Sequence, residues 1–133
     1  MIDRLQEKDI DQVAQIEAEI FSVPWSIKSF KDALASEQNI YLKAETDDQI
    51  VGYCGIWTSF ESADLCNIAV KKEFRKAGLG QKLLEAGIQA AAAKGVERIL
   101  LEVRQSNKAA IRLYEKNGFQ TIGLRKSYYT KPV

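Results

Sequence analysis

Two glycines stand directly before a helix-like run in the segment KKEFRKAGLGQKLLEAG, residues 71–87, and they limit how this chain can fold. The apolar segment before them, ADLCNIAV at 63–70, is typical of a strand, and the alanine-rich run 79–94 is typical of a helix. A helix N-terminus carries N–H groups without partners, and glycine lets the preceding backbone fold around an anion. The segment therefore predicts a strand–loop–helix unit whose glycines, Gly78 and Gly80, either make a simple turn or hold a phosphate.

Basic residues beside these glycines favour a phosphate, although the common phosphate motifs do not match. Lys71, Lys72, Arg75 and Lys76 precede or enter the loop and add positive charge. No GK[ST] follows the first glycine at the distance that a P-loop requires. A dinucleotide fingerprint needs GxGxxG, and Leu83 stands where its third glycine belongs. If the loop binds a phosphate, its spacing indicates a pyrophosphate cradle of another kind.

The remaining segments predict one continuous domain, residues 1–133. Asp9 and Gln12 stand at capping-box spacing before a first helix that Pro24 ends, and Ser26 can cap a second helix. Periodicity and turn residues predict strands at 2–6, 39–45, 49–59, 63–70, 97–104 and 119–130, and helices at 9–21, 27–34, 79–94 and 107–118. The order β-α-α-β-β-β-α-β-α-β predicts an α/β fold, a mixed sheet with helices on both faces.

Composition excludes several kinds of chemistry. The chain has 19 basic and 18 acidic residues, a net charge of +1, which gives little support for nucleic acid or a membrane as partner. It has no histidine, which excludes Ser-His and Cys-His pairs and histidine-ligated metals, and we expect no metal. Cys54 and Cys66 lack zinc-type spacing, so we expect small buried side chains and no disulfide. The charged N-terminus without a signal-peptide core predicts a cytoplasmic protein.

The motif RKAGLG at 75–80 matches the R/Q-x-x-G-x-G/A signature of the GNAT superfamily of acetyl-CoA-dependent N-acyltransferases, and the chain resembles that superfamily over nearly its whole length. Four further stretches resemble its bacterial members that acetylate the N-terminal alanine of a small-subunit ribosomal protein: FSVPWS, LCNIAV, LEVRQSNKAAIRLYEKNGF and RKSYY. The resemblance implies a mostly antiparallel mixed sheet and acetyl-CoA as co-substrate. It also implies a protein or peptide N-terminus as the acceptor.

The resemblance assigns roles to particular residues. In the superfamily, one strand end binds the pantetheine arm and acetyl carbonyl, and the glycine loop holds the pyrophosphate. The positions that would bind the coenzyme here are Ile68, Ala69, Val70, Arg75, Lys76, Ala77, Gly78, Leu79, Gly80 and Asn107. Glu102 would be the general base and Tyr114 the general acid. Four residues either line the peptide groove or belong to the core: Pro24, Trp25, Tyr128 and Tyr129.

The chemistry of acetyl transfer suits these two residue types. An amine that attacks a thioester must lose a proton, and an α-amino group titrates near pH ~8, so a carboxylate can remove that proton. Glu102 lies in the apolar strand ILLEVR, where it is salt-bridged, exposed or a working base. Tyr114 is either a core aromatic or a phenol that protonates the departing thiolate.

The C-terminus departs from the superfamily pattern. Relatives continue after this point with an acidic dipeptide and a further apolar strand, whereas this sequence ends at YYTKPV. We therefore expect the final family strand to be missing or supplied by another chain, and a monomer or weak homodimer. Two alternatives stay open: a GNAT enzyme that acetylates lysine or a small amine, and a coenzyme-A-binding subunit without activity.

Overall fold

The computed structural model describes residues 1–21, 24–75, 78–102, 108–121 and 126–130, and of residues 102, 120–121 and 126–130 it describes the backbone alone. The strands are β1 (Ile2–Arg4), β2 (Asn39–Thr46), β3 (Gln49–Ser59), β4 (Ser62–Val70), β5 (Arg98–Glu102), β6 (Gln120–Thr121) and β7 (Lys126–Thr130). The helices are α1 (Ile10–Ile20), α2 (Ile27–Leu34), α3 (Leu79–Ala93) and α4 (Lys108–Lys116), with 3-10 turns η1 (Glu7–Asp9) and η2 (Lys72–Phe74). The predicted order is confirmed, except that the last predicted strand, 119–130, divides into β6 and β7.

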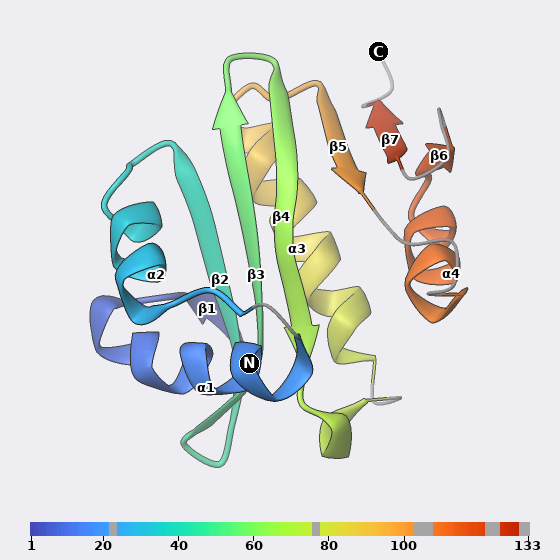
Figure 1. The fold of residues 1–133 in the computed structure, drawn as a ribbon. Coiled ribbons are helices and arrows are strands. Elements are labelled where there is room, and N and C mark those ends of the chain that lie inside the picture. The colour runs from blue at the N-terminus through green and yellow to red at the C-terminus, as the bar shows by residue number, and fades with distance from the viewer. Residues whose placement is uncertain (22–23, 76–77, 103–107, 122–125, 131–133) are drawn as a thin grey trace.

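The strands form a seven-stranded sheet in the order β1-β2-β3-β4-β5-β7-β6 (Figure 1). Among the described residues β4 and β5 pair in parallel, and every other neighbouring pair is antiparallel. The predicted mixed, mostly antiparallel sheet is therefore confirmed. Because β7 lies between β5 and β6, the C-terminal segment adds two strands to the sheet, and the absence of a further family strand stays a prediction.

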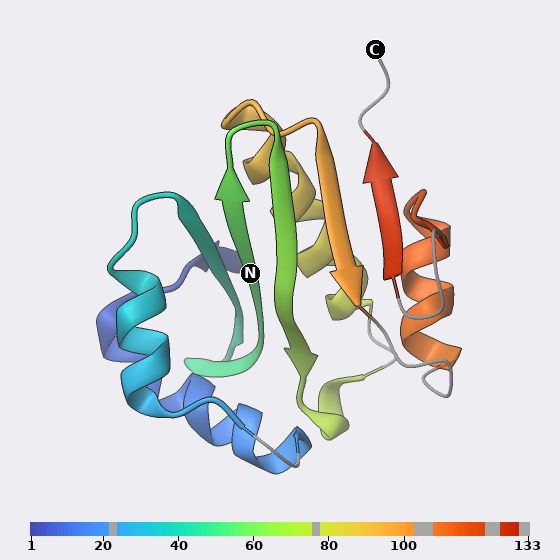
Figure 2. The ribbon, with the colours of Figure 1, turned by 45° about the horizontal axis from the view of Figure 1, so that its top comes forward.

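Helices cover both faces of the sheet, as predicted (Figures 1 and 2). On the face that carries α1 and α2, called here the α1 face, a core of buried side chains forms from Leu5, Ile10, Val13, Ile16, Phe30, Ala33, Tyr41, Ile50, Tyr53 and Ala69. On the opposite face, called the α3 face, α3 and α4 pack on a second and larger apolar core. A Cβ on Gly87 of α3 would lie 2.8 Å from Cδ1 of Ile56, so this glycine lets the helix lie close against β3.

Of the two predicted helix caps, the one at Ser26 is confirmed and the one at Asp9 is wrong. The Ser26 side chain accepts a hydrogen bond from the Ser29 backbone N–H at 3.1 Å and so caps α2. Asp9 makes no side-chain cap for α1, because its carboxylate accepts from Gln6 N–H at 2.9 Å and from the Lys43 ammonium at 2.9 Å. The predicted partner, Gln12, accepts from the backbone of β3 instead. The capping box therefore lies one turn earlier, around η1.

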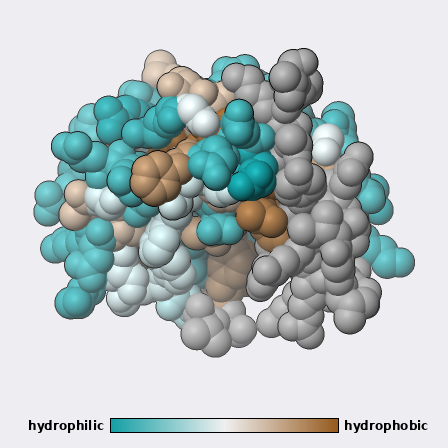
Figure 3. Space-filling model, turned by 90° about the horizontal axis from the view of Figure 1, so that it is seen from above, coloured by the Kyte–Doolittle hydropathy of each residue, from teal (hydrophilic) through white to brown (hydrophobic). Residues whose placement is uncertain are grey.

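The end of the molecule that carries the β3–β4 hairpin has a mostly hydrophilic surface with some apolar side chains near its centre (Figure 3). Phe60 in that hairpin is 89% exposed. No helix in the described ranges has the length and apolar character needed to cross a membrane.

Candidate functional site

The sheet opens between β4 and β5. Their pairing covers Ser62–Asp64 against Arg98–Leu100, and β4 then continues to Val70 with β3 on one side and, in the described part of the chain, no strand on the side of β5. The two strands draw apart toward their C-terminal ends (Figures 1 and 2). The second half of β4 therefore presents backbone N–H and C=O groups along an open edge inside the sheet. An extended ligand can pair with such an edge as an added strand does.

A cleft of about 1040 Å³ lies at this opening, large enough for a sizeable small molecule. Its walls come from the end of α1, the second half of β4, the loop around η2, the start of α3 and the first turns of α4: Glu19, Ile20, Phe21, Leu65, Cys66, Asn67, Ile68, Ala69, Val70, Lys72, Glu73, Arg75, Gly80, Ala109, Ala110, Leu113 and Tyr114. Segments far apart in the sequence thus meet at one site. Six of the predicted site residues line it: Ile68, Ala69, Val70, Arg75, Gly80 and Tyr114.

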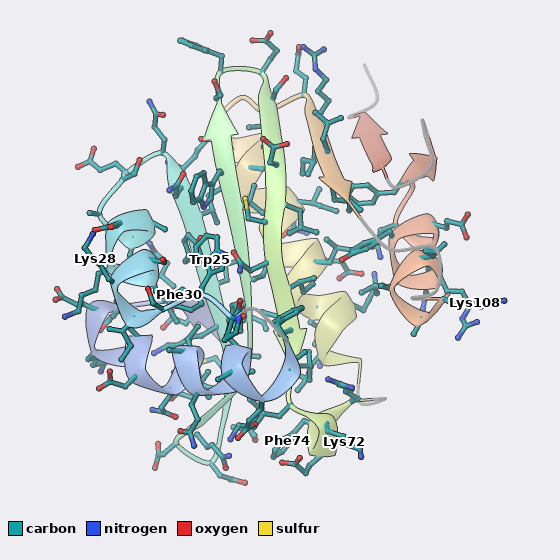
Figure 4. All side chains as sticks on the ribbon, in the orientation of Figure 1. Trp25, Lys28, Phe30, Lys72, Phe74 and Lys108 are labelled. Carbon is teal, nitrogen blue, oxygen red and sulfur yellow. The ribbon has the colours of Figure 1, made fainter. Side chains whose placement is uncertain are left out.

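The glycine loop forms one end of the cleft. Gly78 precedes α3 in the left-handed conformation, with φ of 80°, which glycine adopts at little cost. No side chain of the described residues caps α3, so within that part of the chain the N–H groups of its first turn stay available for an anion. The Arg75 side chain donates from Nε to the Val70 carbonyl at 3.0 Å and ties the loop to β4. Lys72 from η2 also lies at this end (Figure 4). The predicted loop residues Lys76 and Ala77 lie outside the described residues.

Tyr114 lies at the edge between the α3-face core and the cleft. It is 6% exposed, and its ring packs against Phe119 with centroids 5.6 Å apart. Burial raises the pKa of Tyr114 to about 12, so the phenol stays protonated at neutral pH. Its hydroxyl bonds to no described residue, yet no buried polar side-chain atom in the described ranges lacks a partner, so the hydroxyl reaches the cleft. Tyr114 is therefore both a core aromatic and a hydrogen-bond donor toward the cleft.

Four other predicted residues lie at or beyond the limits of the description. The backbone of Glu102 ends β5 and pairs with Lys126, and its side chain lies outside the described part. Tyr128 and Tyr129 pair by backbone with Leu100 and Ile99, and their side chains are outside it as well. Asn107 lies outside the described residues. The roles assigned to these residues stay predictions.

Trp25 packs in an aromatic group on the α1 face rather than among the residues that line the cleft. Its ring centroid lies 5.3 Å from that of Phe30 (Figure 4), and 5.9 Å from that of Trp57. Its backbone N–H donates to the Glu17 carboxylate at 3.0 Å, which holds the segment between α1 and α2. Pro24 is exposed and also lies away from the cleft lining. The core alternative therefore fits Trp25 better than the groove alternative.

Cys66 and Asn67 were not predicted at the site. The pairing of β3 with β4 passes from Gly55↔Asn67 to Ile56↔Leu65, so Cys66 is the extra residue of a β-bulge. Cys66 is exposed, so its predicted burial is wrong, because the bulge turns it out of the ladder; Cys54 is buried as predicted, and both thiols are free. The surrounding cleft walls raise the pKa of the Cys66 thiol to about 11. The sequence signal for Asn67 was a polar residue within an apolar strand.

The described residues hold no group of three or more His, Cys, Asp or Glu side chains that would bind a metal ion. The features that can act on a ligand are instead an open strand edge, an uncapped helix start with cations beside it, and a buried phenol.

The mostly antiparallel mixed sheet and the glycine loop between β4 and α3 are the features that the resemblance to the GNAT acetyltransferases implied. The model of the acetyltransferase (GNAT) family matches residues 10–119, and the chain belongs to that family. It is therefore an N-acetyltransferase by family, which confirms the resemblance found in the sequence.

Named relatives point more narrowly. A ribosomal protein bS18-alanine N-acetyltransferase of Haemophilus influenzae is 36% identical over 132 residues, covering 99% of this chain and 89% of that protein. A Bacillus subtilis protein, whose name assigns it the same activity provisionally, is 43% identical over 124 residues and covers 92% of this chain and 82% of its own length. The crystal structure of the ribosomal-protein-S18-alanine N-acetyltransferase from Escherichia coli matches with a TM-score of 0.88 at 28% identity, over 100% of this chain and 94% of that one.

Proposed function

We propose that this chain transfers the acetyl group of acetyl-CoA to the N-terminal α-amino group of a protein that begins with alanine, with ribosomal protein bS18 as the acceptor. The observation that carries the proposal is the cleft where β4 leaves β5, which the Tyr114 hydroxyl and the start of α3 both face. The names of relatives 43% and 36% identical over nearly the whole chain supply the acceptor. Such an acceptor would be met in the cytoplasm, where free thiols such as these persist.

The cleft suits the pantetheine arm and the pyrophosphate of coenzyme A. The open edge of Ile68, Ala69 and Val70 can bond the amide groups of the pantetheine arm, as β-pairing requires. The start of α3, with Lys72 and Arg75 beside it, places partial and full positive charge where a pyrophosphate would lie. The loop 75–80 and Asn107 complete the proposed donor site.

The proposed reaction needs two proton transfers. The bound acetyl-CoA supplies a thioester, whose C–S bond breaks as the amine nitrogen bonds to the carbonyl carbon. Glu102 takes the proton that the amine loses, directly or through a water. The Tyr114 hydroxyl faces the cleft as a neutral donor and stabilises or protonates the thiolate that leaves. Glu102 and Tyr114 thus each hold or move one proton in the proposed reaction.

Acetyl transfer to a synthetic peptide that begins with alanine tests the proposal. We expect saturable transfer from acetyl-CoA, and a large loss of turnover in Glu102→Gln with little change in the Kd for coenzyme A measured by calorimetry. Peptides with a blocked N-terminus and an internal lysine, and free polyamines, should be poor acceptors. Coenzyme binding without transfer to any amine would instead favour a non-catalytic subunit. Transfer to lysine or polyamine in preference to the peptide would overturn the choice of acceptor.

A further inference from the structure

Asn67 is a buried polar side chain at the wall of the cleft, and the proposed reaction does not yet use it. It is 6% exposed and lies on β4 directly before the strand edge that is proposed to hold the donor. Burying an amide costs free energy unless its donors and acceptors are bonded. The partners of its Oδ1 and Nδ2 atoms therefore decide which of the two can bond to a ligand in the cleft.

The β-bulge at Cys66 decides which way Asn67 points. Side chains alternate between the faces of a strand, so Leu65 and Asn67 would share a face in a regular strand. Leu65 packs in the α3-face core, whereas Asn67 bonds to Tyr41, a member of the α1-face core. The extra residue turns Asn67 to the α1 face, opposite to the helix whose start is proposed to bind the pyrophosphate.

A chain of hydrogen bonds fixes the amide of Asn67. A Cβ on Gly55 would lie 2.4 Å from the Tyr41 ring, so this glycine lets the ring cross β3 toward β4. Trp57 Nε1 donates to the Tyr41 hydroxyl at 2.8 Å, and an indole N–H can only donate. Burial raises the pKa of Tyr41, which keeps its proton, and the hydroxyl donates to Asn67 Oδ1 through a long bond of 3.5 Å.

The same chain leaves the other half of the amide free. With Oδ1 turned toward Tyr41, Nδ2 points the other way, and in the described part of the chain it donates to no group. No buried polar side-chain atom of the described residues lacks a partner, so Nδ2 must reach the open cleft. Glu19, Ile20 and Phe21 at the end of α1 line the cleft as well. A fixed N–H donor thus faces the cleft on the side away from α3.

We propose that Nδ2 of Asn67 donates a hydrogen bond to the carbonyl oxygen of the acceptor's first residue and so selects peptide α-amines over side-chain and small amines. The inference rests on the proposed function. In a peptide N-terminus, the carbon that bears the amine is bonded directly to a carbonyl carbon. A lysine side chain or a polyamine has a methylene there, which accepts no hydrogen bond. One donor at this place therefore separates the two classes of acceptor.

The test compares two acceptors in each variant: a peptide that begins with alanine and a simple alkyl amine without a carbonyl. In Asn67→Ala, kcat/KM for the peptide should fall about ten-fold, mainly through a higher KM, as expected for one hydrogen bond. The kcat/KM for the alkyl amine should stay within about two-fold, so the preference for the peptide shrinks. Tyr41→Phe, which removes the hydroxyl that fixes the amide, should shift the same ratio by a smaller factor.

A control variant separates this role from a general effect on the sheet. Thr58→Val removes the hydrogen bond that Thr58 Oγ1 donates to the Gln38 carbonyl at 2.5 Å, away from the cleft, and should leave the ratio unchanged. An equal fall with both acceptors, or no change with the peptide, would overturn the role of Asn67. Absence of transfer to the peptide in the unmodified enzyme would overturn the proposed function instead, so the two failures are distinguishable.

Discussion

The two faces of the sheet bury different chemistry. The α3-face core is almost wholly apolar, with the Tyr114 phenol at its edge. All four buried polar or charged side chains of the described residues lie on the α1 face: Asp9, Glu17, Lys43 and Asn67. Lys43 bonds to Asp9 there, and the Tyr53 hydroxyl donates to Glu17. Because buried polar groups need defined partners, this face has much less freedom to repack than the other.

The difference matches what each side of the cleft is proposed to bind. The donor is the same molecule in every turnover, and a strand edge with a helix start can hold it through backbone groups. The acceptor must be distinguished from other amines, which requires side chains in fixed positions. Two linked hydrogen bonds behind Asn67, one buried and one partly buried, supply that fixity on the α1 face. Apolar packing thus supports donor binding, and polar packing supports selection.

The largest effect should come from the Tyr114 phenol at the edge of the α3-face core. Tyr114→Phe keeps the ring that packs on Phe119 and removes the hydroxyl that faces the cleft. We expect kcat to fall by about 10²- to 10⁴-fold, the range for loss of a proton donor or acceptor. The Kd for coenzyme A and the thermal midpoint should change little. Steady-state kinetics with the alanine peptide measures the loss, and an unchanged kcat would contradict the role of Tyr114.

On the α1 face, breaking the buried ion pair should lower the stability of the fold rather than the rate of acetyl transfer. Lys43→Met leaves Asp9, which is 5% exposed, without the ammonium 2.9 Å away. We expect the free energy of unfolding to fall by about 3–5 kcal/mol, the cost of an unpaired buried charge. Lys28→Met is the matched control, because its pair with Asp32 is 85% and 69% exposed and should contribute less than about 1 kcal/mol. Urea unfolding compares them, and equal losses would contradict the contrast between buried and surface pairs.

Hydrophobic periodicity and turn residues predicted the elements as far as α4, because those signals are local. Three features depended on partners distant in the chain. Asp9 left its expected capping role because Lys43, 34 positions away, competes for its carboxylate. The bulge at Cys66 depends on how β3 and β4 pair, which alternation in one strand does not show. The place of Asn67 required that bulge and the space above Gly55 together. Motif spacing, by contrast, indicated a phosphate site at the glycine loop, and the family resemblance implied a role for Tyr114; Gly80 of the loop and Tyr114 both line the cleft.

The two glycines of the loop should differ, which tests how the donor side is built. Gly78→Ala places a Cβ on a residue with φ of 80°, a strain of about 1–2 kcal/mol, even though no described residue apart from the chain neighbours of Gly78 comes within 4 Å of that Cβ. Its effect should appear as weaker binding of coenzyme A or lower stability. In Gly80→Ala, the new Cβ would lie 3.6 Å from Leu113 Cδ2, an ordinary contact, so little change is expected. Calorimetric Kd values and urea unfolding for both variants make the comparison; equal effects would contradict it.

The smallest effect should be a loss of folding stability at acid pH that comes from Asp9 on the α1 face. Burial alone would raise the pKa of Asp9, but hydrogen bonds from Lys43 and Gln6 outweigh it and hold that pKa below its ordinary value of 3.8. The unfolded state therefore takes up a proton before the folded state does, and the contribution of Asp9 is present above pH 3.8 and is lost as pH falls through the folded pKa. Urea unfolding measured from neutral pH to below pH 3.8 should show that the free energy of unfolding falls with pH. The fall should be less steep in Asp9→Asn than in the unmodified chain. Since Asp32 is exposed, Asp32→Asn should leave the slope of the free energy of unfolding against pH unchanged. If Asp9→Asn also leaves that slope unchanged, the acid sensitivity comes from another group.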